Sequence, residues 1–482
     1  MTMKVRNIIL GALVTVVSVP AMAQQTDEIQ QQVAAIIKSG APDANKQVAA
    51  IAKQNKKNVD ALVGIGKAYL TVKDYANAKL YAQQAADLVS NKKATATATP
   101  FVLLGNIAVS EDDGGTAAAQ FQQAIYFDPK DPDGYRRYAQ IMSKTDPTGA
   151  VQTLEDLRAQ RPDYPVDLIA AEIYSGAGKM AKAIEYYDKV SIGEMKDYQI
   201  SDYATNLFLS KNYDKSLMVA TEGHNIFPRN ASFNRLMMFN YTDKKDYDNA
   251  LLAADKLFNA SDSLKASVYD YTYYAKALKS AGKYQEAIAA YQNLQGVKDC
   301  DAATSMEADK SISDCYKSLS DYEKAGQYLD KYLKAQPQSS FSIDEMLAQL
   351  YVDQLADEKS TADVKKAAYE KADALYESLG NKYPDNAAYV AMKRARMPFS
   401  LALPQMEQLK LAGPHFATLG DILYAKSDRS GGETKMLVDA YNTLIAYYVH
   451  ATNDMDKAKE VAAKLVELDP NNGNAKAVLG MK

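Results

Sequence analysis

Lys245-Asp246-Tyr247-Asp248-Asn249-Ala250 decides the fold of this chain, because the same arrangement returns along the sequence. In each copy a short turn is followed by a bulky residue, two spacer residues and a small residue. The bulky and small residues of the eight copies are Tyr75/Ala78, Pro147/Ala150, Met180/Ala183, Tyr213/Ser216, Tyr247/Ala250, Tyr284/Ala287, Tyr322/Ala325 and Met455/Ala458. From residue 180 to residue 322 the copies follow at steps of 33, 34, 37 and 38 residues. This period, with helical patterning inside it, predicts a helical hairpin stacked on copies of itself, which is a solenoid.

A single repeat, residues 59–92, shows how the two helices of a hairpin would pack. Its first half carries residues at steps of three and four, which places them on one helix face: Leu62, Ile65, Gly66 and Tyr69. A second helix follows Asp74 and has its own inner face: Tyr75, Ala78, Ala82, Ala85 and Leu88. We expect Gly66 and Ala78 where the helices cross, because only a missing or one-carbon side chain lets helix axes approach to ~8–10 Å.

Prolines that follow apolar runs give a second, independent measure of the repeat. Proline cannot continue a helix and biases the preceding residue toward extended geometry, so each one marks the end of a unit. These prolines are Pro129, Pro162, Pro228, Pro337, Pro384 and Pro470. The first two lie 33 residues apart and the third lies 66 residues further on, in agreement with the repeat period.

This pattern resembles the tetratricopeptide repeat family, which has small residues where the helices cross, an aromatic residue on the second helix and a proline at the end. The match is most specific in four sets: Gly66/Tyr69/Ala78/Ala85, Gly105/Ala117/Phe121/Ala124/Pro129, Ala275/Ala287/Tyr291 and Ala446/Ala458/Leu465/Pro470. It departs from the family at Ser216 and Gly223, where alanine is usual, and in having no tryptophan. The resemblance covers about three quarters of the chain. It implies an all-α, right-handed superhelical solenoid of stacked antiparallel helix pairs, with a concave surface lined mainly by first helices and used to bind a partner.

The organisation that we expect has five parts. A signal peptide (1–23) and N-terminal capping helices (24–58) precede the tetratricopeptide-like array (59–386). An irregular helical segment or degenerate repeat (387–438) then leads to a final repeat with a closing helix (439–482).

Two stretches depart from the period. Residues 352–366 read as an elongated helix pair or a solvated loop. Residues 387–438 are expected to form short helical segments, such as 416–424, that are interrupted at Pro398, Pro404, Gly413-Pro414 and Gly431-Gly432. A degenerate repeat is favoured over a functional insert there, because the apolar residues still recur at helical steps.

The N-terminus predicts export. Lys4 and Arg6 precede an apolar run over residues 8–19 and then Ala21-Met22-Ala23, which is the order of a secretory signal peptide cleaved after Ala23, although a buried helix is the alternative. The run is too short for a membrane span of ~20 residues. No cysteine near the junction offers a lipid attachment point, so a periplasmic protein is expected. Without residues 1–23 the net charge is −6, which gives no electrostatic case for nucleic acid or an anionic membrane as partner.

Few residues in the sequence indicate a catalytic, metal-binding or cofactor-binding site. His224, His415 and His450 lack paired-ligand spacing, so no metal site is expected, and no cofactor motif is found. The only cysteines are Cys300 and Cys315. A disulfide between them is possible in an oxidising compartment. Two free thiols are favoured, because Cys300 precedes a helix that is expected to begin near Ala303, and Cys315 would lie ~18 Å from the start of that helix at 1.5 Å per residue.

Partner contacts are expected from first-helix residues that the packing scheme does not use. By helical phase these should face the concave side: Tyr198, Phe208, Arg235, Phe239, Tyr269, Thr272 and Lys276. Aromatic residues and arginine are the usual anchors of protein interfaces. The alternative for each is packing, because several of the 34 tyrosines must be half-buried between units. The lysine and asparagine clamp of some family members is not found.

Three functional hypotheses stay open. The favoured one is a non-catalytic protein-protein interaction scaffold or adaptor of the bacterial cell envelope, which binds a peptide or protein on its concave surface. The second is a glycan-binding nutrient-capture protein on the same helices, against which the absence of tryptophan and of a lipid anchor weigh. The third is an enzyme with its site in residues 387–438, and no catalytic motif supports it.

Overall fold

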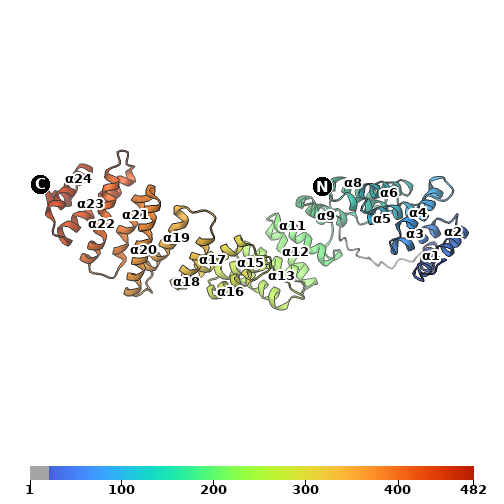
Figure 1. The fold of residues 1–482 in the computed structure, drawn as a ribbon, viewed down its shortest axis with the longest axis horizontal. Helices are drawn as coiled ribbons and strands as arrows, with labels where there is room; N and C mark the ends of the chain where they lie inside the picture. The colour runs from blue at the N-terminus through green and yellow to red at the C-terminus, as the bar shows by residue number, and fades with distance from the viewer. Residues whose placement is uncertain (1–20, 482) are drawn as a thin grey trace. The chain divides into compact units, whose positions relative to one another are not determined.

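Helices form throughout residues 21–481, the part of the chain that the computed structural model describes (Figure 1). No strand occurs within this range, so the predicted all-α class is confirmed. Contacts divide the chain into unit 1, which ends at Asn240, and unit 2, which begins at Tyr241.

Unit 1 is a series of helices joined by short turns. They are α1 (Ala21–Lys38), α2 (Ala44–Gln54), α3 (Val59–Thr71), α4 (Tyr75–Ser90), α5 (Thr99–Ser110), α6 (Gly114–Phe127), α7 (Pro132–Met142), α8 (Pro147–Gln160), α9 (Val166–Gly176), α10 (Met180–Tyr187), the 3₁₀ turn η1 (Ile192–Glu194), α11 (Asp197–Leu209) and α12 (Tyr213–Ile226). The unit boundary falls within α13 (Ala231–Asp243).

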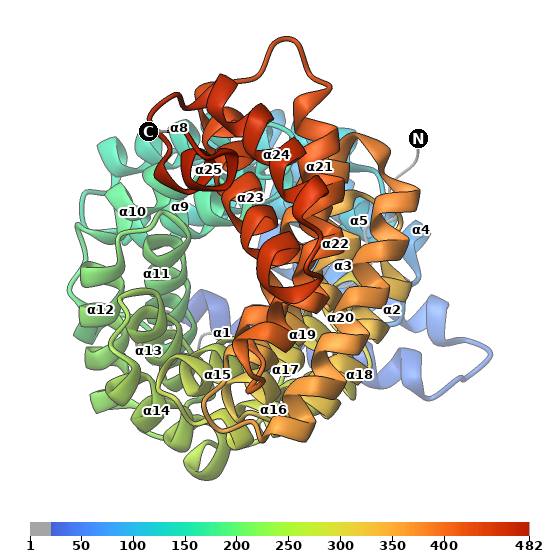
Figure 2. The ribbon, with the colours of Figure 1, turned by 90° about the vertical axis from the view of Figure 1, so that its left-hand side faces the viewer.

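Unit 2 continues the series. Its elements are α14 (Tyr247–Asp255), the π turn η2 (Lys256–Ala260), α15 (Val268–Ser280), α16 (Tyr284–Gln295), α17 (Ala302–Ser318), α18 (Tyr322–Ala335), α19 (Phe341–Ala356), α20 (Ala362–Lys382), the 3₁₀ turn η3 (Pro384–Asn386), α21 (Ala387–Arg396), the 3₁₀ turn η4 (Met397–Ser400), α22 (Gln405–Tyr424), α23 (Gly431–Ala446), the π turn η5 (Tyr447–Ala451), α24 (Met455–Leu468) and α25 (Gly473–Leu479). Each helix from α19 to α23 packs on the next one (Figure 2).

The second helix of a pair begins at the bulky residue of the repeated motif in all eight copies. The residue two positions earlier adopts a left-handed conformation in seven of them, with φ between 55° and 76°: Lys73, Gly178, Lys211, Lys245, Gly282, Ser320 and Asn453. The next N–H closes the turn by donating to a carbonyl of the first helix, as Asp74 N does to Tyr69 O at 3.0 Å. The same aspartate then caps the second helix by accepting from Asn77 N. The repeated turn therefore ends one helix and starts the next.

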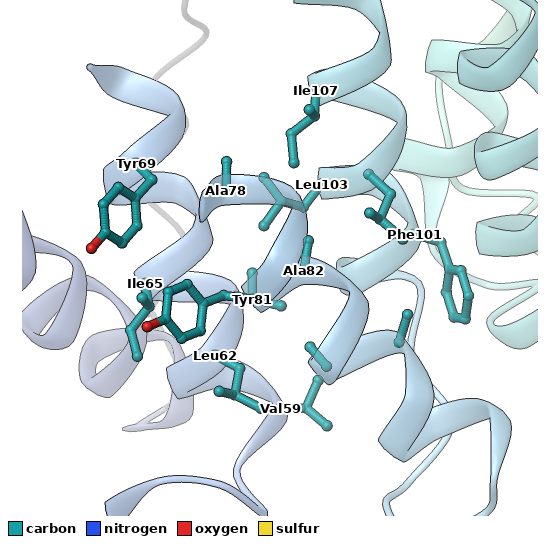
Figure 3. Packing of buried hydrophobic residues seen from close by; sticks show 14 of the residues in the cluster. Val59, Leu62, Ile65, Tyr69, Ala78, Tyr81, Ala82, Phe101, Leu103 and Ile107 are labelled. Carbon is teal, nitrogen blue, oxygen red and sulfur yellow. The ribbon is translucent and has the colours of Figure 1, made fainter. Parts of the chain in front are cut away.

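Small residues lie where the paired helices cross, as the spacing predicts. A Cβ atom on Gly66 would stand 2.9 Å from Leu103 Cδ2 and 3.1 Å from Ala78 O, so only glycine fits there without movement. Ala78, Ala250 and Ala287 are fully buried in their hairpins. Figure 3 shows the apolar side chains of α3, α4 and α5 meeting around this crossing.

The departures from the family pattern at Ser216 and Gly223 have a physical explanation. Ser216 is fully buried, and its hydroxyl donates to Ala204 O across the pair at 2.8 Å, which satisfies the polar group. A Cβ on Gly223 would lie 2.5 Å from the ring of Phe233, which is itself fully buried. Ser216 thus replaces the usual alanine at the α11/α12 contact, and Gly223 does so where α12 meets Phe233 of α13.

The irregular segment is more regular than the sequence predicts. Gly413-Pro414 does not separate two short helices, because α22 runs through Pro414 as a single helix of 20 residues. Packing holds the helix on both sides of the proline, since Ala412 and Phe416 are buried and Gly413 lies against the ring of Tyr447. The stretch 352–366 belongs to an elongated helix pair, α19 and α20, which was one of the two expected alternatives.

The remaining expectations concern the N-terminus and the cysteines. Most of the predicted signal peptide, residues 1–20, lies outside the described residues, and α1 begins at Ala21. No helix within residues 21–481 combines the length and apolar character needed to cross a membrane. Cys300 and Cys315 are free, as favoured. Burial raises the pKa of the Cys315 thiol to about 11, and Cys300 is half-buried instead of exposed.

Candidate binding surface

Side chains bridge the first helices of successive pairs in unit 2. Lys279 Nζ of α15 lies 2.6 Å from Asp314 Oδ2 of α17, and Lys317 of α17 pairs with Asp353 of α19. From α21, Tyr389 OH donates to Glu345 Oε1 of α19 at 2.8 Å, and Lys393 Nζ donates to Gln349 Oε1 at 2.8 Å. We call this row on α15, α17, α19 and α21 the first-helix ladder. Its partners lie 35, 36 and 44 residues apart in sequence, about one repeat each.

A pocket of about 250 Å³ opens between α17 and α19, in the middle of the ladder. Its wall includes Asp314, Lys317, Leu329, Glu345, Met346 and Asp353. Leu329 reaches it from α18 and is 5% exposed, so the pocket has an apolar floor beneath a charged rim. This is the combination that binding pockets commonly have, in which apolar area supplies affinity and a few polar groups orient the ligand.

Glu345 is held from two sides by phenol groups. Its Oε1 atom accepts hydrogen bonds from Tyr376 OH at 2.9 Å and from Tyr389 OH at 2.8 Å. Burial and the bond to Glu345 raise the pKa of both phenols, to about 12 for Tyr389, so both remain protonated donors at neutral pH. Asp314 and Asp353 each form an ion pair with a lysine. Among the described residues, no ion pair includes Glu345. Glu345 is therefore a fixed acidic group in the pocket wall that has hydrogen bonds but no cation.

The seven residues expected from the sequence fall into two groups, one in each unit. In unit 1, Tyr198 is 54% exposed and donates to Glu172 Oε1 at 3.1 Å, whereas Phe208 and Arg235 are half-buried. Phe239 is only 9% exposed, and its ring centroid lies 5.9 Å from that of Phe208. Phe239 thus packs inside unit 1, with little of its ring available to a partner.

The unit 2 group lies on α15. Tyr269 is 71% exposed, and Lys276 is exposed with its Nζ 3.1 Å from Asp243 Oδ1. Thr272 is half-buried, and its hydroxyl donates to Val268 O. The sequence reasoning therefore named exposed residues of α15 but none of the pocket residues on α17 and α19. Opposite charges spaced by one repeat on first helices were the signal that could have found them.

One further titratable cluster lies in the irregular segment. Arg394 of α21 binds Asp373 of α20 through two hydrogen bonds, at 2.7 and 2.9 Å, and His415 Nε2 of α22 lies 3.6 Å from Asp373 Oδ1. Burial and the neighbouring Arg394 lower the pKa of His415 below its usual value, so its imidazole is neutral at neutral pH. The ion pair links α20 and α21, and the neutral imidazole of α22 lies beside it. No group of metal-ligating side chains occurs in the described part of the chain.

Comparisons with known proteins identify repeats in three stretches of the chain. Tetratricopeptide repeat family models match residues 59–89, 275–340 and 440–472. No curated protein matches the chain. Among solved structures, the C-terminal part of a repeat protein from Cytophaga hutchinsonii is 23% identical, with a TM-score of 0.38, over 58% of this chain and 100% of that one. A tetratricopeptide repeat protein from Parabacteroides merdae is 14% identical, with a TM-score of 0.36, over 52% of this chain and 98% of that one. The chain thus contains tetratricopeptide repeats in the three matched stretches, each of which includes one of the residue sets identified from the sequence.

Proposed function

We propose that this chain is a non-catalytic interaction scaffold or adaptor of the bacterial cell envelope, which binds a peptide or protein on the concave surface formed by its first helices. Tetratricopeptide repeats generally mediate protein-protein interactions. The observation that carries the proposal is the first-helix ladder of unit 2, with its pocket and the exposed Tyr269 ring. A face with an apolar floor, a charged rim and an exposed aromatic side chain has the composition of a protein interface.

The proposed contacts form one group in each unit. In unit 2 they are Tyr269, Thr272 and Lys276, together with the pocket between α17 and α19. In unit 1 they are Tyr198, Phe208 and Arg235. The envelope location is supported by the order of charged, apolar and small residues over residues 4–23, which is that of a signal peptide.

Replacing Tyr269 by alanine is expected to weaken partner binding about tenfold, because an exposed aromatic ring gives large contact area at low entropic cost. The side chain is 71% exposed, so folding should not change. The measurement is a titration of the full chain with an envelope polypeptide retained by the immobilised protein and identified by mass spectrometry. The matched control is Tyr126→Ala, which removes a ring that is 75% exposed on α6, a second helix. Equal affinities for the two variants would contradict the assignment of the surface.

The second candidate is glycan binding, and exposed tyrosine rings are the observation that favours it. Tyr198 and Tyr269 offer faces on which a sugar could stack. A glycan array separates the candidates: saturable sugar binding that Tyr269→Ala abolishes, with no envelope polypeptide retained, would favour this alternative.

A further inference from the structure

The pocket between α17 and α19 has two chemically different parts. Leu329 and Leu350 are 5% and 4% exposed and form its floor together with Met346. Three carboxylates lie in the wall, those of Asp314, Glu345 and Asp353, whereas Lys317 supplies the single ammonium group among the lining residues. A ligand that fills the pocket must therefore satisfy an apolar surface and a net negative rim at once.

The ion pairs show which carboxylate remains to be neutralised. Asp314 is paired with Lys279 at 2.6 Å, and Asp353 is paired with Lys317. Glu345 Oε1 receives two tyrosine hydrogen bonds, which fix the orientation of the carboxylate without cancelling its charge. A cation that enters the pocket would form a charge-assisted hydrogen bond with a group that is already in place, which lowers the entropic cost of binding.

The size and chemistry of the pocket exclude other occupants. Pockets for drug-sized molecules have ~300–1,000 Å³, and this one, at about 250 Å³, is suited to a single side chain. An anionic side chain would meet the carboxylate of Glu345, which has no cation, and a purely apolar one would cover Glu345 without replacing the water that solvates its charge. Lysine and arginine combine an aliphatic stem with a cationic end, so the stem can lie on Leu329 and Met346 while the charge reaches Glu345.

We propose that this pocket binds a lysine or arginine side chain of the partner polypeptide, with the leucine and methionine floor against its stem and Glu345 against its charge. The inference rests on the proposed function, because it names the chemistry of a partner bound on the first-helix face. In this proposal the pocket determines which partner sequences bind, while exposed residues such as Tyr269 contribute contact area with the partner.

The test uses the full chain and oriented peptide libraries, in which one central position is fixed and the flanking positions are degenerate. The protein is expected to bind libraries with arginine or lysine at the fixed position about tenfold more strongly than those with glutamine or glutamate. In Glu345→Gln this preference should disappear while binding of the glutamine library is unchanged, because the amide oxygen still accepts both tyrosine hydrogen bonds but carries no charge. The matched control is Glu370→Gln, which removes the same charge from an exposed position on α20.

The outcomes separate the inference from the function on which it rests. Peptide binding without a preference for arginine or lysine, or a preference that Glu345→Gln and Glu370→Gln reduce equally, would overturn the pocket assignment and leave the scaffold function standing. Binding of no library, while a sugar ligand binds, would overturn both. Free arginine that binds as tightly as the arginine library would also contradict the proposal, because the site would then serve a small molecule instead of a polypeptide.

Discussion

Gly105→Ala is expected to destabilise the α5/α6 hairpin by about 3 kcal/mol, at the upper end of the usual cost of overpacking. The added methyl carbon would lie 2.3 Å from Phe121 Cε1. The Phe121 ring is 1% exposed, so it cannot turn into solvent to make room. Because the chain has two units, one global free energy of unfolding does not describe it, and we choose hydrogen exchange of the α5 and α6 amides as the measurement.

Gly114→Ala is the matched control for this prediction. Gly114 begins α6, and a Cβ atom there meets nothing within 4 Å, so exchange should stay the same or slow slightly. Combining Gly105→Ala with Phe121→Leu should recover part of the loss, because the smaller side chain vacates the space that the methyl group needs. If Gly105→Ala were tolerated as well as Gly114→Ala, close contact of the paired helices would not be what stabilises the hairpin.

Asp373→Ala is expected to cost about 2 kcal/mol in the stability of α20, α21 and α22, because breaking a partly buried ion pair leaves one charge without its partner. The side chains of Asp373 and Arg394 are 22% and 18% exposed, and two short hydrogen bonds join them. The nearest remaining acid among the ion pairs of the described residues, Glu377, is 3.6 Å from Arg394 and 62% exposed, so it compensates poorly. Hydrogen exchange of these three helices measures the effect.

An exposed ion pair in the same unit serves as control. Asp330 and Lys334 lie 2.6 Å apart on α18 with side chains 46% and 76% exposed. Removing Asp330 should change stability by less than about 0.5 kcal/mol, because water and salt screen such pairs. A double replacement of Asp373 by leucine and Arg394 by methionine should be less harmful than Asp373→Ala alone. Equal effects of Asp373→Ala and Asp330→Ala would show that the Arg394 pair is not the link between these helices.

The fold followed from the sequence wherever one residue type was sterically required. Gly66 and Ala78 were placed at a helix crossing from spacing alone, and a Cβ atom on Gly66 would indeed lie only 3.1 Å from Ala78 O. The prediction that the helix would be interrupted at Pro414 was wrong, because contacts with distant residues decide the outcome there. A proline signals a helix end through its own backbone, but buried neighbours on both sides can hold the helix together, and those contacts come from distant residues such as Tyr447.

The candidate site was predicted less well, because helical phase gives a direction but not an exposed fraction. Tyr269 and Phe239 occupy comparable positions in the sequence reasoning, yet one is 71% exposed and the other 9%. The Phe239 ring packs beside that of Phe208, with ring centroids 5.9 Å apart, and helical phase alone does not reveal such a neighbour. The orientation of Glu345 likewise depends on Tyr376 and Tyr389, which lie 31 and 44 residues away in sequence. Such contacts become visible only when the side chains are placed.

Photocrosslinking in intact cells tests most directly whether the first-helix face of unit 2 binds a polypeptide. A photoreactive amino acid replaces Tyr269 on α15 or Ser342 at the pocket on α19, and the comparison positions are Glu323 on α18 and Glu370 on α20, which are exposed on second helices. We predict that the two first-helix positions yield the same polypeptide adduct and that the two second-helix positions do not. Adducts from Glu323 and Glu370 alone, or from none of the four positions, would contradict the account.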